Sequence, residues 1–322
     1  MKLLNSFLNF LFSKITPQNH SNSSQKGNIM DFEYYQKEAE KTIQKYLADE
    51  KMNQIIPFLG IIGEAGSVLT ELKKKLRDGE GYASFSEKLS EELGDVLWYI
   101  SAIASQNKIS LAEIAKNNLR KTTDRFSEED NTKFITYDEN NPLKEQFPRE
   151  FEIKFVSFEE DGKSKVRIEG KDGKKIGDIL TDNAYEDDGY RFHDIFHFGY
   201  VAYLGWSPVV RKLMEIKRRS DEKKNEIEDG GRALITEELI TLYIYNHAQN
   251  HRLFKYSDRV DTEVLKTVQK LVSKIEVSDC TAKQWEICII NSYKVFDELK
   301  KNNGGRVLVS VQNKKMFYLG IK

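Results

Sequence analysis

The sequence predicts a mainly α-helical protein with two helical modules and a small β-meander before the second. Three observations support this fold class. Apolar residues recur at helical spacing in Leu59–Leu72, in Leu93–Ile103 and again within residues 262–301. Residues 151–179 instead alternate between apolar and polar, as strands do. The chain has 322 residues, which is long enough for two domains.

The composition limits the classes of function. The chain is 31% charged but has a formal net charge of −1, so it lacks the positive excess that bulk binding to nucleic acid requires. Cys280 and Cys288 lie in one helical segment, at a spacing that suits neither a disulfide nor a zinc quartet. We therefore expect a reducing, cytoplasmic location. No apolar run approaches the roughly 20 residues that span a bilayer, so no integral membrane segment is expected.

Residues 1–29 are predicted to be a flexible extension. Met1–Ile15 is short and amphipathic, and a segment rich in Ser, Asn, Gln and Gly follows it. Three alternatives stay open: a signal peptide, weak anchoring at a membrane interface, and an upstream start that leaves Met30 as the functional first residue.

The first module, residues 30–126, is predicted to hold four helices. The first helix runs from Phe32 through Tyr46, and two motif helices follow that are joined by a loop at Asp78–Tyr82. Ser110 is the expected N-cap of the fourth helix, Leu111–Arg125, because Glu113 completes a capping box. Both motif helices have apolar stripes that we expect to be buried. These are Ile61, Ile62, Val68, Leu69 and Leu72 in one helix, and Leu93, Val96, Leu97 and Ile100 in the other.

Carboxylates are set inside the helical pattern of both motif helices. Glu64, Ser67 and Glu71 share one face of the first, and Glu91, Glu92 and Asp95 flank the stripe of the second. Carboxylates that face one another across a groove repel unless a cation lies between them, and oxygen ligands suit Mg²⁺ or Mn²⁺. The groove is therefore a candidate metal site.

The two motifs, Gly-Glu-Ala-Gly-Ser-Val-Leu-Thr-Glu-Leu and Glu-Glu-Leu-Gly-Asp-Val-Leu-Trp-Tyr, resemble those of the MazG-like, all-α nucleoside triphosphate pyrophosphohydrolases. Those enzymes carry an E-x-x-E helix followed by an E-x-x-D helix, bind Mg²⁺ and hydrolyse an NTP to NMP and pyrophosphate. The resemblance covers about residues 30–126. It implies a four-helix module and an assembly that is a homodimer or a higher homo-oligomer.

The resemblance also implies roles for individual residues. Glu64, Glu92 and Asp95 would hold Mg²⁺, or Mn²⁺, and either Glu91 or Glu71 would orient or deprotonate the attacking water. Asn118, Lys121 and Arg125 of the fourth helix would lie near the nucleotide, where a cationic edge suits the triphosphate. The alternative for these three is a solvated helix face.

Ser67 departs from the family pattern, because the family has its second glutamate at this position. A hydroxyl is a weak, neutral ligand, so the site would hold fewer metal ions, bind them more loosely or be inactive. Glu71 lies one turn further along the same face, about 6 Å away at 1.5 Å per residue, and would compensate only partly.

Residues 127–150 are polar and are predicted to be a linker, and residues 151–322 to be the β-meander and second helical module. Two turn signals, Glu160–Lys163 and Lys171–Lys174, separate the strands of the meander. Helices are expected within residues 262–301. After them comes a terminal strand, Val307–Val311, that joins the meander. The basic run Lys217–Arg219 is expected to be a solvated face.

A second group of ligand-type residues lies in this module. His193, Asp194 and His197 are placed on one side of a helix, and Glu237 and Glu238 lie in a later acidic helix. In layout this resembles the first module, with Asp194 and His197 where Glu64 and Ser67 stand, so the second half is interpreted as a diverged copy. Mixed imidazole and carboxylate ligands suit Mn, Fe or Zn. The alternative is a hydrogen-bonded core pair.

The segment Asp229-Gly-Gly-Arg232 before the acidic helix has two interpretations. Asp229 would cap the helix while Arg232 and backbone N–H groups hold phosphate, or the segment is a tight turn.

The sequence therefore predicts a metal-dependent nucleoside triphosphate pyrophosphohydrolase that acts on NTP or dNTP. One alternative is a degenerate first module that serves as a nucleotide sensor or dimerisation scaffold, with a His/Asp/Glu metal site in the second module. The other is a non-enzymatic interaction protein in which both clusters are structural.

Overall fold

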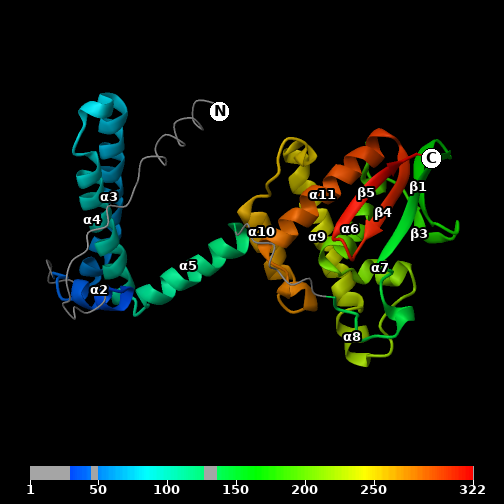
Figure 1. Ribbon diagram of the computed structural model, residues 1–322, viewed down its shortest axis with the longest axis horizontal. Helices are drawn as coiled ribbons and strands as arrows, with labels where there is room; N and C mark the ends of the chain where they lie inside the picture. The colour runs from blue at the N-terminus through cyan, green and yellow to red at the C-terminus, as the bar shows by residue number, and fades with distance from the viewer. Residues whose placement is uncertain (1–29, 45–49, 127–135, 322) are drawn as a thin grey trace. The chain divides into compact units, whose positions relative to one another are not determined.

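The computed structural model describes residues 30–44, 50–126 and 136–321, and the chain divides into two compact units (Figure 1). The first unit is Met1–Leu119 and the second is Arg120–Lys322. The predicted fold class is confirmed, because the described residues are mainly helical and include one small antiparallel sheet. The extension predicted for residues 1–29 lies outside the described residues.

The first unit is built on a pair of long helices. The short connection between α3 and α4 makes them neighbours over much of their length (Figure 1). The α5 helix passes from the first unit into the second. The bounds are α2 (Phe32–Glu40), α3 (Glu50–Asp78), the 3₁₀ turn η1 (Gly79–Gly81), α4 (Phe85–Gln106) and α5 (Leu111–Phe126).

The first helix is shorter than the sequence predicts. It was expected to continue through Tyr46, but α2 ends at Glu40 and residues 43–44 are not helical. The Thr42 hydroxyl donates to the carbonyl of Ala39 at 2.7 Å, and the Thr42 amide donates to the same carbonyl. Local bonds of this kind compete with the helical pattern, and they end α2 here.

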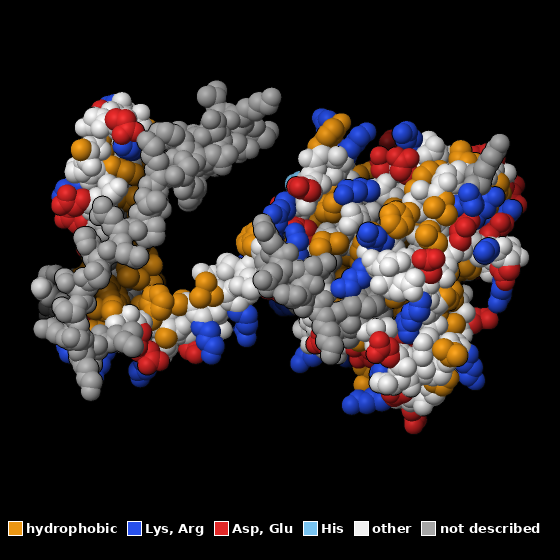
Figure 2. Space-filling model, viewed as in Figure 1, with side chains coloured by type: hydrophobic (Ala, Val, Ile, Leu, Met, Phe, Trp, Pro, Cys, Tyr) orange, Lys and Arg blue, Asp and Glu red, His pale blue; other side chains and the backbone are white. Residues whose placement is uncertain are grey.

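The apolar stripe of the motif helices is not buried, contrary to the prediction. Ile62, Leu69 and Leu93 are 70%, 60% and 50% exposed, and Figure 2 shows apolar side chains at the surface of this unit. Leu72 is exposed as well, whereas Val96, Leu97 and Ile100 are half-buried. One copy of this unit therefore has an apolar face that its own described residues leave uncovered.

By length and composition alone, the segment Lys51–Gly81 qualifies as a helix that could cross a membrane. The expectation that no stretch of the chain reaches that length does not hold by this criterion. The segment carries Glu64 and Glu71 near its middle, and burying a carboxylate in a bilayer is costly.

The second unit contains a five-stranded antiparallel sheet with the strand order β3-β2-β1-β4-β5. The prediction that the terminal strand joins the meander is confirmed, because β4 pairs with β1 (Figure 1). The strand β5 was not predicted from the sequence. The strands are β1 (Glu150–Glu160), β2 (Lys163–Gly170), β3 (Lys175–Leu180), β4 (Gly304–Ser310) and β5 (Lys315–Gly320).

Helices pack on this sheet and on one another around a single apolar core. The most buried is α6, every residue of which is buried, and it lies against α11. Gly199 of α6 allows this approach, since a Cβ at that position would lie 2.0 Å from Oγ of Ser292. The helices are α6 (Asp194–Leu204), α7 (Pro208–Leu213), α8 (Glu222–Ile227), α9 (Gly231–Asn250), α10 (Thr262–Leu271) and α11 (Ala282–Lys301). The 3₁₀ turns are η2 (Leu143–Glu145), η3 (Tyr190–Phe192), η4 (Arg252–Phe254) and η5 (Glu276–Asp279).

Part of the segment predicted to be a linker is built into the second unit. Tyr137, Asp138 and Phe147 are buried there. The carboxylate of Asp138 accepts the Phe147 amide at 2.8 Å and a guanidinium N–H of Arg149 at 2.9 Å. These bonds fold residues 136–149 onto the core despite their polar composition.

Candidate functional site

Three carboxylates of the first unit come together between α3 and α4. Glu64 belongs to α3, Glu92 and Asp95 are one turn apart on α4, and one oxygen of each lies within 4.8 Å of the others. Among the described residues, none of the three forms an ion pair with Lys, Arg or His. An all-oxygen donor set without a direct ion pair fits a hard divalent cation such as Mg²⁺ or Mn²⁺.

The other predicted carboxylates point to different partners. An oxygen of Glu71 lies 2.5 Å from Nζ of Lys74, and the Tyr82 hydroxyl donates to the other oxygen. These hydrogen bonds, from Lys74 first and then from Tyr82, lower the pKa of Glu71. Glu91 is exposed and lies 2.8 Å from Nζ of Lys88. Ser67 is half-buried, and neither Glu71 nor Glu91 joins the cluster in its place.

Two residues beside the cluster were not identified from the sequence. The hydrogen bond with Glu71 raises the pKa of Lys74, and the nearby charge of Glu92 raises it further. Burial raises the pKa of Tyr35 on α2, and the negative charge of Asp95 adds to this effect. Lys74 was detectable, because it follows Ser67 by seven residues and so returns to the same helix face.

The predicted nucleotide-binding residues divide between the two units. Asn118 is exposed in the first unit, whereas Lys121 and Arg125 belong to the second. Arg125 donates to the carbonyl of Val260 at 2.8 Å and lies 3.8 Å from a carboxylate oxygen of Glu286. Its charge is thus partly offset within the second unit. The nucleotide-binding role of all three stays a prediction.

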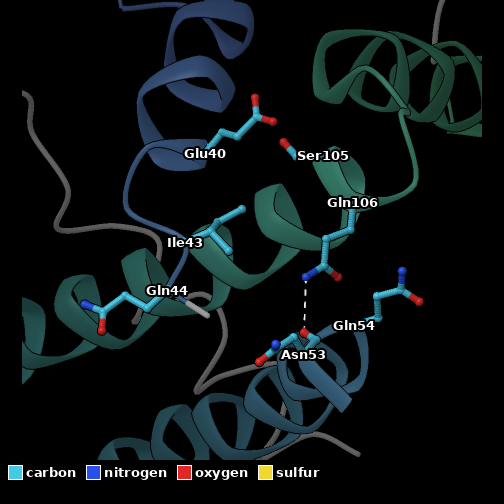
Figure 3. A pocket seen from close by; sticks show the side chains of 7 residues that line it. All are labelled: Glu40, Ile43, Gln44, Asn53, Gln54, Ser105 and Gln106. Atoms are coloured by element: carbon cyan, nitrogen blue, oxygen red, sulfur yellow. Dashed lines mark hydrogen bonds between the residues drawn. The ribbon is translucent and has the colours of Figure 1, made fainter. Parts of the chain in front are cut away.

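A pocket of about 360 Å³ lies elsewhere on the first unit (Figure 3). Nε2 of Gln106 donates to the carbonyl of Asn53 at 3.3 Å within it. Asn53 precedes Glu64 by 11 residues, so the pocket is about 16 to 17 Å along α3 from the carboxylates at 1.5 Å per residue. The pocket and the carboxylate cluster are therefore separate sites on the first unit. The lining residues are Glu40, Ile43, Gln44, Asn53, Gln54, Ser105 and Gln106.

The predicted second group also forms a cluster. His193, His197 and Glu238 bring one ligand atom each to within 4.8 Å of the others. Glu237 does not join them, because it is buried and its carboxylate accepts a hydrogen bond from Nδ1 of His197 at 2.8 Å. Asp194 Oδ1 lies 3.2 Å from Nε2 of His193. The two adjacent glutamates of α9 therefore have different surroundings.

The surroundings of the two histidines shift their pKa values in opposite directions. Burial lowers the pKa of His193. Burial acts on His197 in the same direction, but the charge and hydrogen bond of Glu237 outweigh it and raise the pKa of His197 to about 10.

Asp229 does not cap α9, contrary to one interpretation. Its carboxylate is buried and accepts the backbone amide and the guanidinium of Arg218, both at 2.7 Å. Arg218 is also buried, which contradicts the solvated face expected for Lys217–Arg219. The N-cap of α9 is Gly230, which has no side chain to offer, and Arg232 is exposed on the first turn. Asp229 therefore does not have the capping role that the phosphate-binding interpretation gave it.

Asp138 belongs to the same buried charge network and gives it a pH dependence. Burial tends to raise the pKa of Asp138, but the Phe147 amide, Arg211 and Arg149 outweigh it and lower the pKa. A carboxyl with a lowered pKa stabilises the fold above its unfolded pKa of about 3.9, and that contribution is lost as the pH falls through the folded value. We expect the unfolding free energies of wild type and Asp138→Asn, from urea titrations, to differ at pH 7 and to converge below about pH 4. A difference that is constant with pH would contradict this prediction.

A second histidine pair was not predicted from the sequence. His247 and His251 are one turn apart near the end of α9, and their Nε2 atoms lie 3.3 and 3.8 Å from the same oxygen of Asp261. The i, i+4 spacing was the available signal. This pair is more exposed than His193 and His197.

Comparison with known proteins assigns both halves of the chain. Residues 56–128 match the MazG nucleotide pyrophosphohydrolase domain, and residues 132–322, more than half of the chain, match the MazG C-terminal domain. The prediction that the second half is a diverged copy of the first stays a prediction, since the halves match separate families.

A curated relative and the solved structures add little detail. The chain is similar to the "Gene 37 protein" of Mycobacterium phage L5, with 38% identity over 69 residues. The match covers 21% of this chain and 60% of that protein, so the chain spans less than two thirds of the relative's length. No solved structure matches the chain. The two domain matches decide the assignment: the chain belongs to the MazG family of nucleotide pyrophosphohydrolase proteins.

Proposed function

We propose that the first unit hydrolyses a nucleoside triphosphate, NTP or dNTP, to the monophosphate and pyrophosphate with the help of a divalent metal ion. The observation that carries this proposal is the cluster of Glu64 with Glu92 and Asp95, three oxygen donors from two helices with no cationic partner among the described residues. The match to the MazG nucleotide pyrophosphohydrolase domain supports the reaction class.

The chain's own residues take distinct roles in this proposal. Glu64, Glu92 and Asp95 would hold the ion, which when bound supplies charge stabilisation to the phosphates. Lys74, fixed by Glu71 beside Glu92, is suited to neutralise phosphate charge. Asn118, Lys121 and Arg125 remain proposed contacts to the nucleotide.

Of the two carboxylates predicted to orient or deprotonate water, Glu91 is the better base. The pKa of Glu71 is lowered by its two hydrogen bonds, and a general base works best with a pKa near the working pH. The partner of Glu91 is an exposed lysine, and surface ion pairs of this kind contribute about 0–1 kcal/mol, so it is readily released.

The test is product analysis with a panel of NTPs and dNTPs in Mg²⁺, in Mn²⁺ and in EDTA. We expect pyrophosphate and the matching monophosphate, formed with either metal and absent in EDTA. Orthophosphate with the diphosphate would show a different reaction. Saturable nucleotide binding without turnover would instead establish the sensor function that Ser67 leaves open.

Ser67 provides a test of the metal site itself. Ser67→Glu restores a carboxylate one turn after Glu64, and we expect it to lower the Mg²⁺ concentration for half-maximal activity by about tenfold, equivalent to about 1.4 kcal/mol. Metal titration of the reaction rate measures this shift. Thr70→Glu, which adds the same charge at an exposed position of α3, is the control and should leave the titration nearly unchanged. Equal effects of both variants would show that only the added charge matters.

We further propose that a second copy of the chain covers the exposed apolar face of the first unit. Ile62→Lys places a charge in that face, and we expect it to shift the assembly from dimer or higher oligomer to monomer in light scattering. The matched control is Leu143→Lys, because Leu143 is exposed in the second unit. A monomeric wild type would remove this proposal while leaving the hydrolase proposal in place.

A further inference from the structure

We propose that His193, His197 and Glu238 of the second unit form a binding site for a divalent first-row transition-metal ion such as Zn²⁺. This site is separate from the carboxylates of the first unit. It combines two imidazoles and a carboxylate, a ligand set that favours Zn, Fe, Mn or Co over Mg.

The hydrogen bonds of the two rings engage both Nδ1 atoms, so each Nε2 is the nitrogen that a metal ion would bind, in place of any proton there. Nδ1 of His193 lies 2.8 Å from the carbonyl of Tyr190, and a carbonyl oxygen only accepts, so Nδ1 carries the proton. Nδ1 of His197 lies 2.8 Å from Glu237 in the same way. Metal-binding histidines are typically oriented by such a bond from the other ring nitrogen.

Glu237 is itself rigidly held. One of its oxygens accepts the Ser207 hydroxyl at 2.6 Å, and the other accepts the Val209 amide at 2.8 Å. The carboxylate is fully buried. Because Glu237 is fixed by α7 and its cap, the ring of His197 is fixed as well, and its Nε2 points at Glu238.

Nε2 of His197 is the independent sign of a ligand. It is fully buried and has no hydrogen-bond partner among the described residues. The nearest carboxylate oxygen, of Glu238, is 3.5 Å away, beyond the roughly 3.2 Å of an N–H···O bond. A buried polar atom without a partner is unfavourable, so a proton donor or a cation is expected to satisfy it.

Nε2 of His193 also lacks a hydrogen-bond donor, because it faces Oδ1 of Asp194 at 3.2 Å. With the proton on Nδ1, two lone pairs face each other there, and a cation relieves both this contact and the one at His197. The 3.5 Å between Nε2 of His197 and the oxygen of Glu238 also fits, since donors about 2.1 Å from a tetrahedral zinc ion are about 3.4 Å apart. A proton on Nε2 of His197 is the alternative occupant.

The site is accessible from solvent through one ligand. The side chain of Glu238 is 51% exposed, whereas that of His197 is fully buried. A bound ion would therefore have the protein on one side and solvent on the other, which leaves a coordination position for water or a small anionic ligand.

The test uses the full-length protein freed of metal with EDTA and titrated with Co²⁺, followed by visible absorption, and then with Zn²⁺ in competition. We expect a visible Co²⁺ band that saturates at one equivalent and that Zn²⁺ abolishes. His197→Ala should eliminate the band, and Glu238→Gln should weaken Co²⁺ binding at least about tenfold. Glu237→Gln, which changes the partner that orients His197 and none of the three ligands, should weaken it about 10- to 100-fold.

Two control variants and a folding check show whether a lost band reports this site. His251→Ala and Glu92→Gln remove ligands of the other two clusters and should retain the band. Because His197 is buried, its variant is checked by circular dichroism, and half-exposed Glu238 gives the decisive variant if His197→Ala fails to fold. The proposal is overturned if wild type gives no saturable band, which would favour a protonated His197. It is also overturned if the band disappears in His251→Ala but persists in Glu238→Gln.

Discussion

Glu92→Gln is expected to reduce metal-dependent pyrophosphate release by at least about 100-fold, because it removes one of the three carboxylates that are proposed to hold the ion. The amide has nearly the shape of the carboxylate, so packing between α3 and α4 is retained. In EDTA the variant should be at least as stable as wild type, since the change removes repulsion among clustered carboxylates. Steady-state kinetics with a pyrophosphate assay and thermal melts in EDTA measure the two effects.

The matched control for Glu92→Gln is Glu87→Gln, which changes the same residue type on the same helix at an exposed position outside the cluster. Its activity should be close to that of wild type. Full activity in Glu92→Gln would show that the cluster does not hold the essential metal. Loss of activity together with a lowered melting temperature would point to damage of the fold instead.

The candidate metal site of the first unit could be predicted from the sequence for a geometric reason. Glu92 and Asp95 are three residues apart on one helix, and the short η1 connection brings their helix back beside that of Glu64. The buried stripe was not predicted correctly. Periodicity shows that Ile62 and Leu69 share a face, but it does not say whether the same chain covers that face.

Long-range partners explain the other differences. Arg218 stands in a basic run that looks like a solvated surface, yet its partners Asp229 and Glu276 lie 11 and 58 residues further along the chain. No local pattern connects these positions. The same limit applies to Glu237 and Glu238, which are identical neighbours in sequence. Only the fold shows that one fixes the ring of His197 and the other faces its Nε2.

The buried network around Asp229 predicts the largest effect on stability. Asp229→Asn removes the charge that offsets Arg218 at 2.7 Å and Arg211 at 3.7 Å, two buried guanidinium groups. Breaking a buried pair by neutralising one partner costs about 3–5 kcal/mol, since the other charge stays buried. At about 2–4 °C per kcal/mol for a unit of this size, we expect the melting temperature to fall by roughly 10 °C.

Asp187→Asn is the control for this prediction, because its carboxylate is mostly exposed and lies 3.9 Å from Arg191. Loss of a surface pair of this kind costs about 1 kcal/mol or less. Similar melting temperatures for the two variants would mean that Glu276 and Asp138 alone compensate the buried guanidinium groups. A large difference would show that Asp229 is the central counter-charge of the buried guanidinium groups, and that its role in this segment is to stabilise the fold.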